Sequence, residues 1–167
     1  HASVIDGIES RVGPITTFVS NAGVPAKQRG DMLEIEPGNF DFTMGVNLRG
    51  AFFLAQEVAQ RMLKQTSDTY RSMTFVTSVS ADMVSIERAE YCISKAALSM
   101  VSSLFALTLA EQGIHVHEVR PGFIRTAMTT EGEGSPTEAI EAHIAAGHVP
   151  QNRWGEEQDV GRSVATL

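Results

Sequence analysis

Apolar residues follow two different spacings along the chain, and the two spacings alternate. Short continuous apolar runs, which are typical of buried strands, occupy residues 15–19, 73–79 and 114–119. Longer segments with apolar residues about 3.6 positions apart, which is typical of helices, occupy 1–12, 41–65 and 89–112. Each connection between successive strands exceeds a dozen residues. The pattern therefore predicts an α/β fold, a doubly wound parallel sheet with helices on both faces.

The helical segment 41–65 contains an unusual polar position. Asn47 lies between Gly45 and Gly50. Asn competes with the helix for backbone hydrogen bonds, and each Gly weakens a helix by up to about 1 kcal/mol relative to Ala. We expect a local irregularity of the helix near Asn47. Considered by itself, Asn47 could also be a polar residue tolerated on the outer face.

The stretch from Met73 to Lys95 carries the strongest candidate chemistry. It begins as a strand that ends near Ser78 and becomes a helix at about Ala89. Tyr91 and Lys95 are four residues apart, so a helix places both side chains on one face, where an ammonium favours an ionised phenol. Ligands of open α/β sheets bind outside the carboxyl ends of the strands. Ser78, at the end of its strand, is therefore expected at the same edge of the sheet as Tyr91 and Lys95. Alone, however, a Tyr four residues before a Lys is usually a surface pair.

Two glycine-containing segments end the other predicted strands. Asn21, Ala22 and Gly23 follow the first strand, and Pro121 and Gly122 follow the third. Taken alone, the Asn21–Gly23 segment is best interpreted as a turn at a strand end. A glycine at a strand end also permits close approach of the backbone to a ligand.

Composition and charge exclude several classes of function. The chain has 167 residues, 43% of them hydrophobic, and a net charge of −7. These values fit one globular domain, and the acidic balance argues against a nucleic-acid surface. Cys92 is the only cysteine, which favours a cytoplasmic location over a secreted one. No apolar run approaches the roughly 18 to 20 residues that span a bilayer, so we expect no membrane partner.

His115 and His117 are the remaining candidates for a metal site. They are two residues apart on the third predicted strand and therefore share one face. No third ligand is positioned by spacing, so we interpret them as strand residues and expect no metal. Cys92 is similarly interpreted as a small helix residue rather than a nucleophile.

The motifs, taken together and in order, resemble the classical short-chain dehydrogenase/reductase family, in particular its 3-oxoacyl reductase-like members. The resemblance runs from about Ile15 to the end of the chain through SNAG, VNLRGAFF, TSVS, YCISK, VRPGFIRT and VPQNRWGEEQDVG. It implies a Rossmann-like fold of which residues 1–167 form a single partial domain, lacking the first strands and the glycine-rich pyrophosphate turn. It also implies that the polar segment from about 126 to 148 is a lid over the substrate.

The resemblance implies hydride transfer between NAD or NADP and a small-molecule carbonyl or secondary alcohol. Tyr91 would then be the general acid/base, and Lys95 would stabilise its anion and hold the nicotinamide ribose. Ser78 would orient the substrate oxygen. Asn47 would hold, through the helix backbone, a water that relays protons towards Lys95. The remaining alternative is a non-catalytic regulator or partner subunit with the same fold.

The resemblance also implies cofactor contacts and an assembly. Asn21, Ala22 and Gly23 would border the adenosine side of the cofactor, and Tyr91 and Lys95 would contact it at the catalytic end. The segment that begins at Pro121 and Gly122 would bring Ile124 and Thr126 to the nicotinamide carboxamide. The two long helices would pair across a two-fold axis, which predicts a homodimer or homotetramer. The sequence distinguishes neither the substrate nor NAD from NADP.

Overall fold

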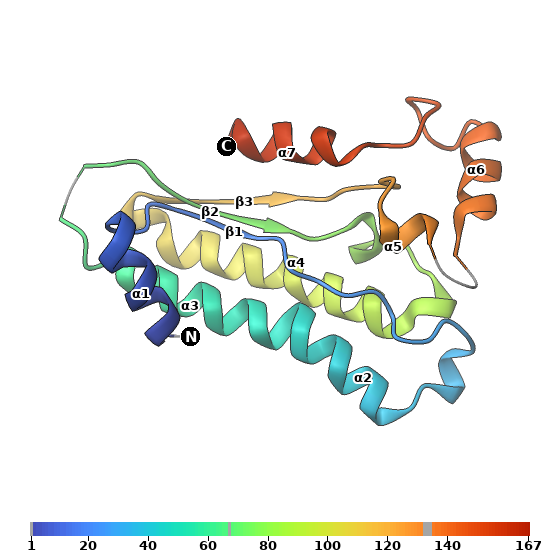
Figure 1. Cartoon of the computed structure of the whole chain (residues 1–167), viewed down its shortest axis with the longest axis horizontal. Helices are drawn as coiled ribbons and strands as arrows, with labels where there is room; N and C mark the ends of the chain where they lie inside the picture. The colour runs from blue at the N-terminus through green and yellow to red at the C-terminus, as the bar shows by residue number, and fades with distance from the viewer. Residues whose placement is uncertain (1, 67, 132–134) are drawn as a thin grey trace.

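The computed structural model describes residues 2–66, 68–131 and 135–167. Three parallel strands form one sheet in the order β1 (Thr17–Ser20), β2 (Arg71–Val76) and β3 (Ile114–Val119). One face of the sheet is covered by α1 (Ala2–Val12), α2 (Pro37–Met44), α3 (Ala51–Met62) and α4 (Ala89–Leu109). The short helices α5 (Ala127–Thr130) and α6 (Thr137–Ala145) lead to α7 (Glu157–Ala165), which lies on the opposite face (Figure 1). The predicted α/β fold with a parallel sheet and helices on both faces is confirmed.

The hydrophobic core lies between the sheet and the layer formed by α3 and α4. Met73 and Phe75 of β2 are 0% exposed, and so is Met62 of α3. Phe75 packs edge-on against Phe18 of β1, with ring centroids 6.5 Å apart, and against Phe105 of α4. Each large apolar side chain buried in this way contributes about 1.5–3 kcal/mol. The core therefore fixes β2, the central strand, against the helix that carries Tyr91 and Lys95.

The irregularity predicted near Asn47 is present as a π-helix, Gly45–Gly50, between α2 and α3. The spacing of the buried residues explains it. Thr43, Asn47, Ala51 and Ala55 are all buried and follow one another at intervals of four. An α-helix has 3.6 residues per turn, so each interval of four would rotate the side chain by about 40°. The wider π turn absorbs part of this drift and keeps Asn47 and the α3 stripe facing inward.

Gly50 permits the close contact that this π turn requires. A Cβ atom at Gly50 would lie 3.2 Å from the carbonyl oxygen of Gly45. That distance is tighter than ordinary packing, and the obstructing atom belongs to the backbone. A residue without a side chain is therefore favoured at position 50 for steric reasons, although glycine also weakens the helix.

Several predicted boundaries shift by a few residues. The strand predicted for residues 73–79 is β2, which begins at Arg71 and ends at Val76, so Ser78 lies beyond the strand. Ser78 is the N-cap of the 3-10 helix Val79–Ala81. Gly113, with φ of 64°, ends the 3-10 turn Ala110–Gln112 that follows α4. Within the predicted lid, 126–148, the structure forms α5 and α6, while Gly132 and Gly134 lie outside the described residues.

The helical stretch Ile86–Gln112, which contains α4, corrects one expectation. Among the described residues it is a helix of 27 residues that contains an 18-residue window with a mean hydropathy of 1.6, long and apolar enough to cross a membrane by those criteria alone. The sequence expectation that no segment reaches this length was therefore wrong. The fold accounts for part of this apolar character, because one face of α4 packs against β2 and β3, and about 33% of the apolar window is buried.

The C-terminal segment is joined to the sheet edge by a short backbone bridge. Ile124 pairs with Gly155 in parallel orientation, and the Arg125 N–H donates to the Gly155 carbonyl at 2.8 Å. Helix α7 then begins with a reciprocal capping box between Glu156 and Asp159. Glu157 and Asp159 lie in the first turn of α7, where acidic side chains stabilise a helix.

Gly155→Ala tests the bridge. The new Cβ would lie 2.5 Å from Ile124 Cδ1 and 3.3 Å from the Phe123 carbonyl oxygen, so we expect a loss of about 1 to 3 kcal/mol in the free energy of unfolding. Gly161→Ala is the matched control, because an added methyl in α7 meets nothing within 4 Å. It should raise stability by up to about 1 kcal/mol. Urea denaturation measures both variants, and effects of the same sign would contradict this packing.

Candidate active site

The ammonium group of Lys95 lies at the centre of the candidate site. Lys95 projects from the second turn of α4 and is 5% exposed. Its Nζ donates to the carbonyl oxygen of Val76, the last residue of β2, at 3.1 Å. Burial lowers the pKa of Lys95 to about 8. The group is therefore a desolvated cation fixed at the carboxyl end of the central strand, where electrostatic interactions are stronger than in water.

Tyr91 lies one turn before Lys95 on the same helix face. Lys95 Nζ is 5.8 Å from the centroid of the Tyr91 ring. The guanidinium of Arg88 lies 5.5 Å from the same ring. Tyr91 is half-buried, so its side chain has access to solvent. The expected proximity of the phenol and the ammonium is present, as the four-residue spacing predicts.

Asn47 connects the π-helix to the segment after β1. Its Oδ1 accepts from the Val24 N–H at 2.8 Å, and its Nδ2 donates to the Val24 carbonyl at 3.0 Å. Nδ2 also donates to Ser94 Oγ on α4 at 3.0 Å. Asn47 is 0% exposed, so these bonds satisfy a fully buried amide. The alternative of a tolerated polar residue on the outer face is wrong.

Gly23 fills the narrow space between Asn47 and Lys95. A Cβ atom at Gly23 would lie 3.4 Å from Asn47 Oδ1 and 3.5 Å from Lys95 Nζ. A larger side chain here would therefore occupy the space beside the ammonium. Asn21 and Ala22, which precede it, are exposed at the end of β1. The segment after the first strand is thus more than a turn, because Val24 and Gly23 contribute directly to the site.

Ser78 lies on the loop that leaves β2. It is buried, and its Oγ accepts from the Ser80 N–H at 3.1 Å, which caps the 3-10 turn. This loop adjoins the segment after β3, because the Val79 N–H donates to the Pro121 carbonyl at 3.0 Å. Gly122 lies close to Val79 as well. Parallel strands bring Ser78, Pro121 and Gly122 to the same edge of the sheet as Lys95.

Ile124 and Thr126 lie further along this segment. Ile124 is held by its bridge to Gly155, and its carbonyl accepts from Thr129 Oγ1 at 2.7 Å. Thr126 is the N-cap of α5 and forms a capping box with Thr129. Both residues are half-buried at the entrance to the predicted lid. Their placement agrees with the order expected from the sequence, and no described contact joins either of them to Lys95.

Arg120 provides a connection that the sequence analysis did not identify. Its guanidinium pairs with Glu118 on β3 and with Asp82 in the loop after Ser78, and it donates to Ser99 on α4. Burial acts to raise the pKa of Glu118, but hydrogen bonds from Arg120, Thr77 and Ser99 outweigh it, so this pKa lies below its usual value. Arg120 therefore ties the Ser78 loop to the end of β3.

Ser94 is the second residue that the sequence analysis missed. It is 0% exposed, its Oγ donates to the Tyr91 carbonyl at 2.8 Å, and the same atom accepts from Asn47. The sequence did contain a signal for this residue. A Ser between Tyr91 and Lys95, in a helix that buries apolar residues, indicates a specific hydrogen bond. Its buried partner, 47 residues away, could not be read from the local pattern.

The site fits one end of a dinucleotide cofactor. Lys95 uses one of its N–H groups on Val76, and an ammonium has three, so two remain for hydroxyl groups such as those of a ribose. The glycine at position 23 leaves room beside that ammonium. The 167 residues contain no glycine-rich turn between a strand and a helix that could hold the pyrophosphate. In the described part of the chain, no group of three or more His, Cys, Asp or Glu residues could hold a metal.

A family model described as enoyl-(acyl carrier protein) reductase matches residues 1–167. The 3-oxoacyl-[acyl-carrier-protein] reductase of Thermotoga maritima is 30% identical over 164 residues, which cover 98% of this chain and 63% of that protein. The crystal structure of a 3-oxoacyl-[acyl-carrier protein] reductase from Brucella melitensis in complex with NAD is 45% identical with a TM-score of 0.94. The chain belongs to the short-chain dehydrogenase/reductase family.

Other members of the short-chain dehydrogenase/reductase family act on different substrates. The L-rhamnose-1-dehydrogenase of Scheffersomyces stipitis is 31% identical over 157 residues, covering 94% of this chain and 58% of that protein. A gluconate 5-dehydrogenase from Burkholderia cenocepacia in complex with NADP and tartrate is 26% identical with a TM-score of 0.84, covering 98% of this chain and 61% of that one. The Brucella melitensis structure is covered to 65% by the whole of this chain. The chain therefore spans less than two thirds of the length of these relatives.

The lowered pKa of Lys95 predicts how stability depends on pH. Between the folded pKa of about 8 and the usual 10.5, the unfolded chain binds more protons, so the free energy of unfolding rises with pH. Relative to Lys95→Met, the unmodified protein should gain up to about 3 kcal/mol over this interval. Lys64→Met, at an exposed lysine, is the matched control and should show no such gain. Urea denaturation at pH 7.5 and pH 10 would contradict the burial of this ammonium if Lys95→Met behaved like Lys64→Met.

Proposed function

We propose that this protein is an NAD(P)-dependent oxidoreductase that transfers a hydride between the cofactor and a small carbonyl or secondary alcohol substrate. The observation that carries the proposal is the buried ammonium of Lys95, 5.8 Å from the Tyr91 ring and beside Gly23. Membership in the short-chain dehydrogenase/reductase family supports it. The reduced cytoplasm is the compartment that we propose for this chemistry.

Tyr91 acts as the general acid/base. In the direction of reduction, its O–H gives a proton to the substrate oxygen as that oxygen develops negative charge; in oxidation, the same phenolate takes the proton back. The nearby Lys95 cation stabilises the phenolate in either direction. Because Lys95 is desolvated, its charge acts more strongly on Tyr91 than an exposed lysine would.

Ser78 and Asn47 support this proton transfer. The Ser78 hydroxyl, at the same edge of the sheet, orients the substrate oxygen by a hydrogen bond. Asn47 fixes the π-helix and the Val24 segment on either side of Lys95. The side-chain bonds of Asn47 thereby hold the backbone around which a proton-relaying water would be bound.

The cofactor would be held by residues on the edge of the sheet that carries the ammonium. Lys95 would bind the ribose hydroxyls, and the segment from Asn21 to Gly23 would border the adenosine. Ile124 and Thr126 would meet the carboxamide. When bound, the cofactor supplies or accepts the hydride. The acyl-carrier-protein and sugar relatives differ in substrate, so the proposal extends to the carbonyl or alcohol class and to no single compound.

We further propose that two copies pair through the outer faces of α3 and α4. Leu104 and Leu107 of α4 are 52% and 81% exposed, and Phe53 of α3 is 42% exposed. Phe52, the neighbour of Phe53, turns inward and packs on Phe105 with ring centroids 5.8 Å apart. An apolar face on two adjacent helices is typical of a homodimer or homotetramer interface.

Tyr91→Phe tests the chemistry. The variant removes only a hydroxyl, so the fold should survive, while kcat should fall at least about a hundredfold because general acid/base catalysis is lost. The assay follows oxidation of NADH or NADPH by the product of the full open reading frame with a panel of carbonyl compounds. Tyr70→Phe is the matched control, since the Tyr70 hydroxyl bonds the Leu167 carbonyl away from the site. More than half of the activity in Tyr91→Phe would contradict the assigned role, and no turnover by the unmodified protein would favour a regulator.

Phe53→Glu tests the assembly. A carboxylate at this position would be withdrawn from water if α3 pairs with a second copy, with only the Arg49 guanidinium, which lies 5.1 Å from the Phe53 ring, close to it, so the oligomer should dissociate. Val12→Glu, at a 78% exposed position of α1, is the control and should leave assembly unchanged. Light scattering at micromolar concentration measures both. A monomeric unmodified protein would rule out the pairing.

A further inference from the structure

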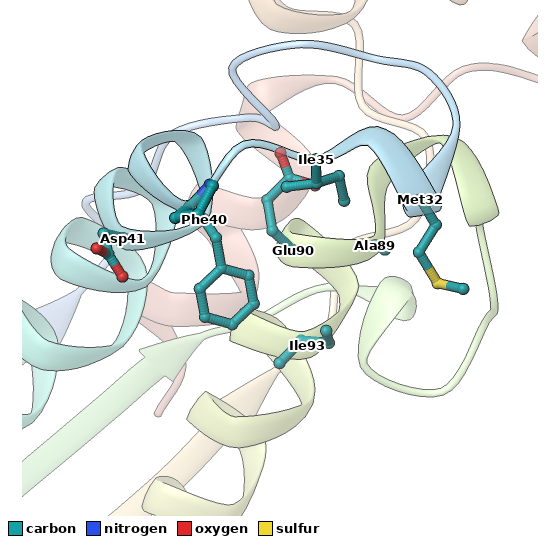
Figure 2. Close-up of a pocket in the computed structure, with 8 residues that line it drawn as sticks. Met32, Ile35, Phe40, Asp41, Ala89, Glu90 and Ile93 are labelled. Carbon is teal, nitrogen blue, oxygen red and sulfur yellow. The ribbon is translucent and has the colours of Figure 1, made fainter.

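Apart from the candidate active site, a hollow lies on the side of α4 that faces α2. It has a volume of about 360 Å³ and lies between the start of α4, the start of α2 and the 3-10 turn Met32–Glu34. Figure 2 shows Glu90 reaching from α4 towards Ile35, with Phe40 beside it and Ile93 below. Glu90 precedes Tyr91 in the chain, but successive helix residues are rotated by about 100°, so the two side chains leave different sides of α4.

The carboxyl group of Glu90 is buried without a described partner. Its side chain is 1% exposed. Within the described residues, neither Oε1 nor Oε2 has a hydrogen-bond partner. A buried carboxylate is normally paired or bound to a cation, because desolvation of the charge is costly. An acidic group held in this way in the wall of a hollow is a ligand-binding feature that the proposed hydride transfer does not use.

The remaining walls define the chemistry of a ligand. They are largely apolar, formed by residues such as Met32, Ile35, Phe40 and Ile93. The second ionisable residue of the lining, Asp41, is also acidic, and no lining residue is basic. A cation with an aliphatic stem matches both properties, since its charge pairs with the carboxylate and its stem contacts the apolar walls.

We propose that this hollow binds an ammonium or guanidinium group on a short aliphatic stem, with Glu90 as the counter-ion. Two molecules can provide such a cation: a free alkylamine, or a second copy of this chain through a Lys or Arg side chain. The second source is sterically open because Ile93 and Met100 of α4 are 48% and 60% exposed on the helix that continues from the hollow. The proposal is independent of the proposed hydride transfer.

The first experiment measures binding of n-butylammonium to the product of the full open reading frame by calorimetry. Sodium chloride keeps the ionic strength constant, and n-butanol, which lacks the charge, is the ligand control. If the source is a free amine, we expect saturable binding of n-butylammonium that Glu90→Gln weakens at least tenfold. Glu87→Gln, an exposed carboxylate one turn earlier, should bind as the unmodified protein does. Ile93→Phe keeps Glu90 but fills the hollow and should also abolish binding. Urea denaturation of both variants should give cooperative unfolding, which shows that the loss of binding is not a loss of fold.

The second experiment distinguishes the source by sedimentation velocity. If the cation belongs to a second copy, the unmodified oligomer takes up no n-butylammonium, and Glu90→Gln shifts its dissociation to at least tenfold higher protein concentration while Glu87→Gln does not. If the source is a free amine, assembly is the same in all three proteins and only amine binding changes. The proposal is overturned if Glu90→Gln alters neither amine binding nor assembly.

Discussion

The withdrawal of one ammonium group from water is the constraint on which the rest of the site depends. Lys95 is placed by its helix against the end of the central strand, where the Val76 carbonyl is its hydrogen-bond acceptor. Gly23 lies beside the ammonium, where a Cβ atom would already be in van der Waals contact with Lys95 Nζ, and the adjacent backbone at Val24 is held by Asn47. Three segments far apart in the sequence thus converge on a single charge. A cation in such surroundings is a stronger electrostatic partner for the neighbouring phenol than the same cation in solvent.

Local patterns were sufficient for the elements and for much of the site. The alternation of strand and helix spacings gave the parallel sheet, and the four-residue interval between Tyr91 and Lys95 gave their common face. The helix irregularity could be anticipated because Asn47 and two glycines are each unfavourable in a helix. These inferences depend only on residues within a few turns of one another, where backbone preference and side-chain period are the governing physics.

The features that escaped prediction depend on contacts across the fold. Ser94 is paired with a residue 47 positions earlier, and Arg120 with one 38 positions earlier, so neither pairing leaves a periodic trace. The strand end near Ser78 was placed too late because the apolar run continues to Val79. In the fold, Val79 is apolar for another reason, since it lies beside Gly122 after the chain has left the sheet. The carboxyl of Glu90, which has no hydrogen-bond partner among the described residues, was equally hidden, because burial of a helix position is decided by its neighbours.

The π turn at Gly45–Gly50 accommodates one residue more than an α-helical turn would. It acts like the insertion of a single residue, which changes the direction in which all later side chains of the helix point. Residues before the turn keep the register of α2, and those after it keep the register of α3. A shortened relative lacking that residue would have to present either the amide or the core stripe of α3 to the interior, but not both. The bulge therefore combines, in one continuous helix, the segment that directs Asn47 towards Val24 and Ser94 and the segment whose apolar stripe packs in the core, each with its own helical phase.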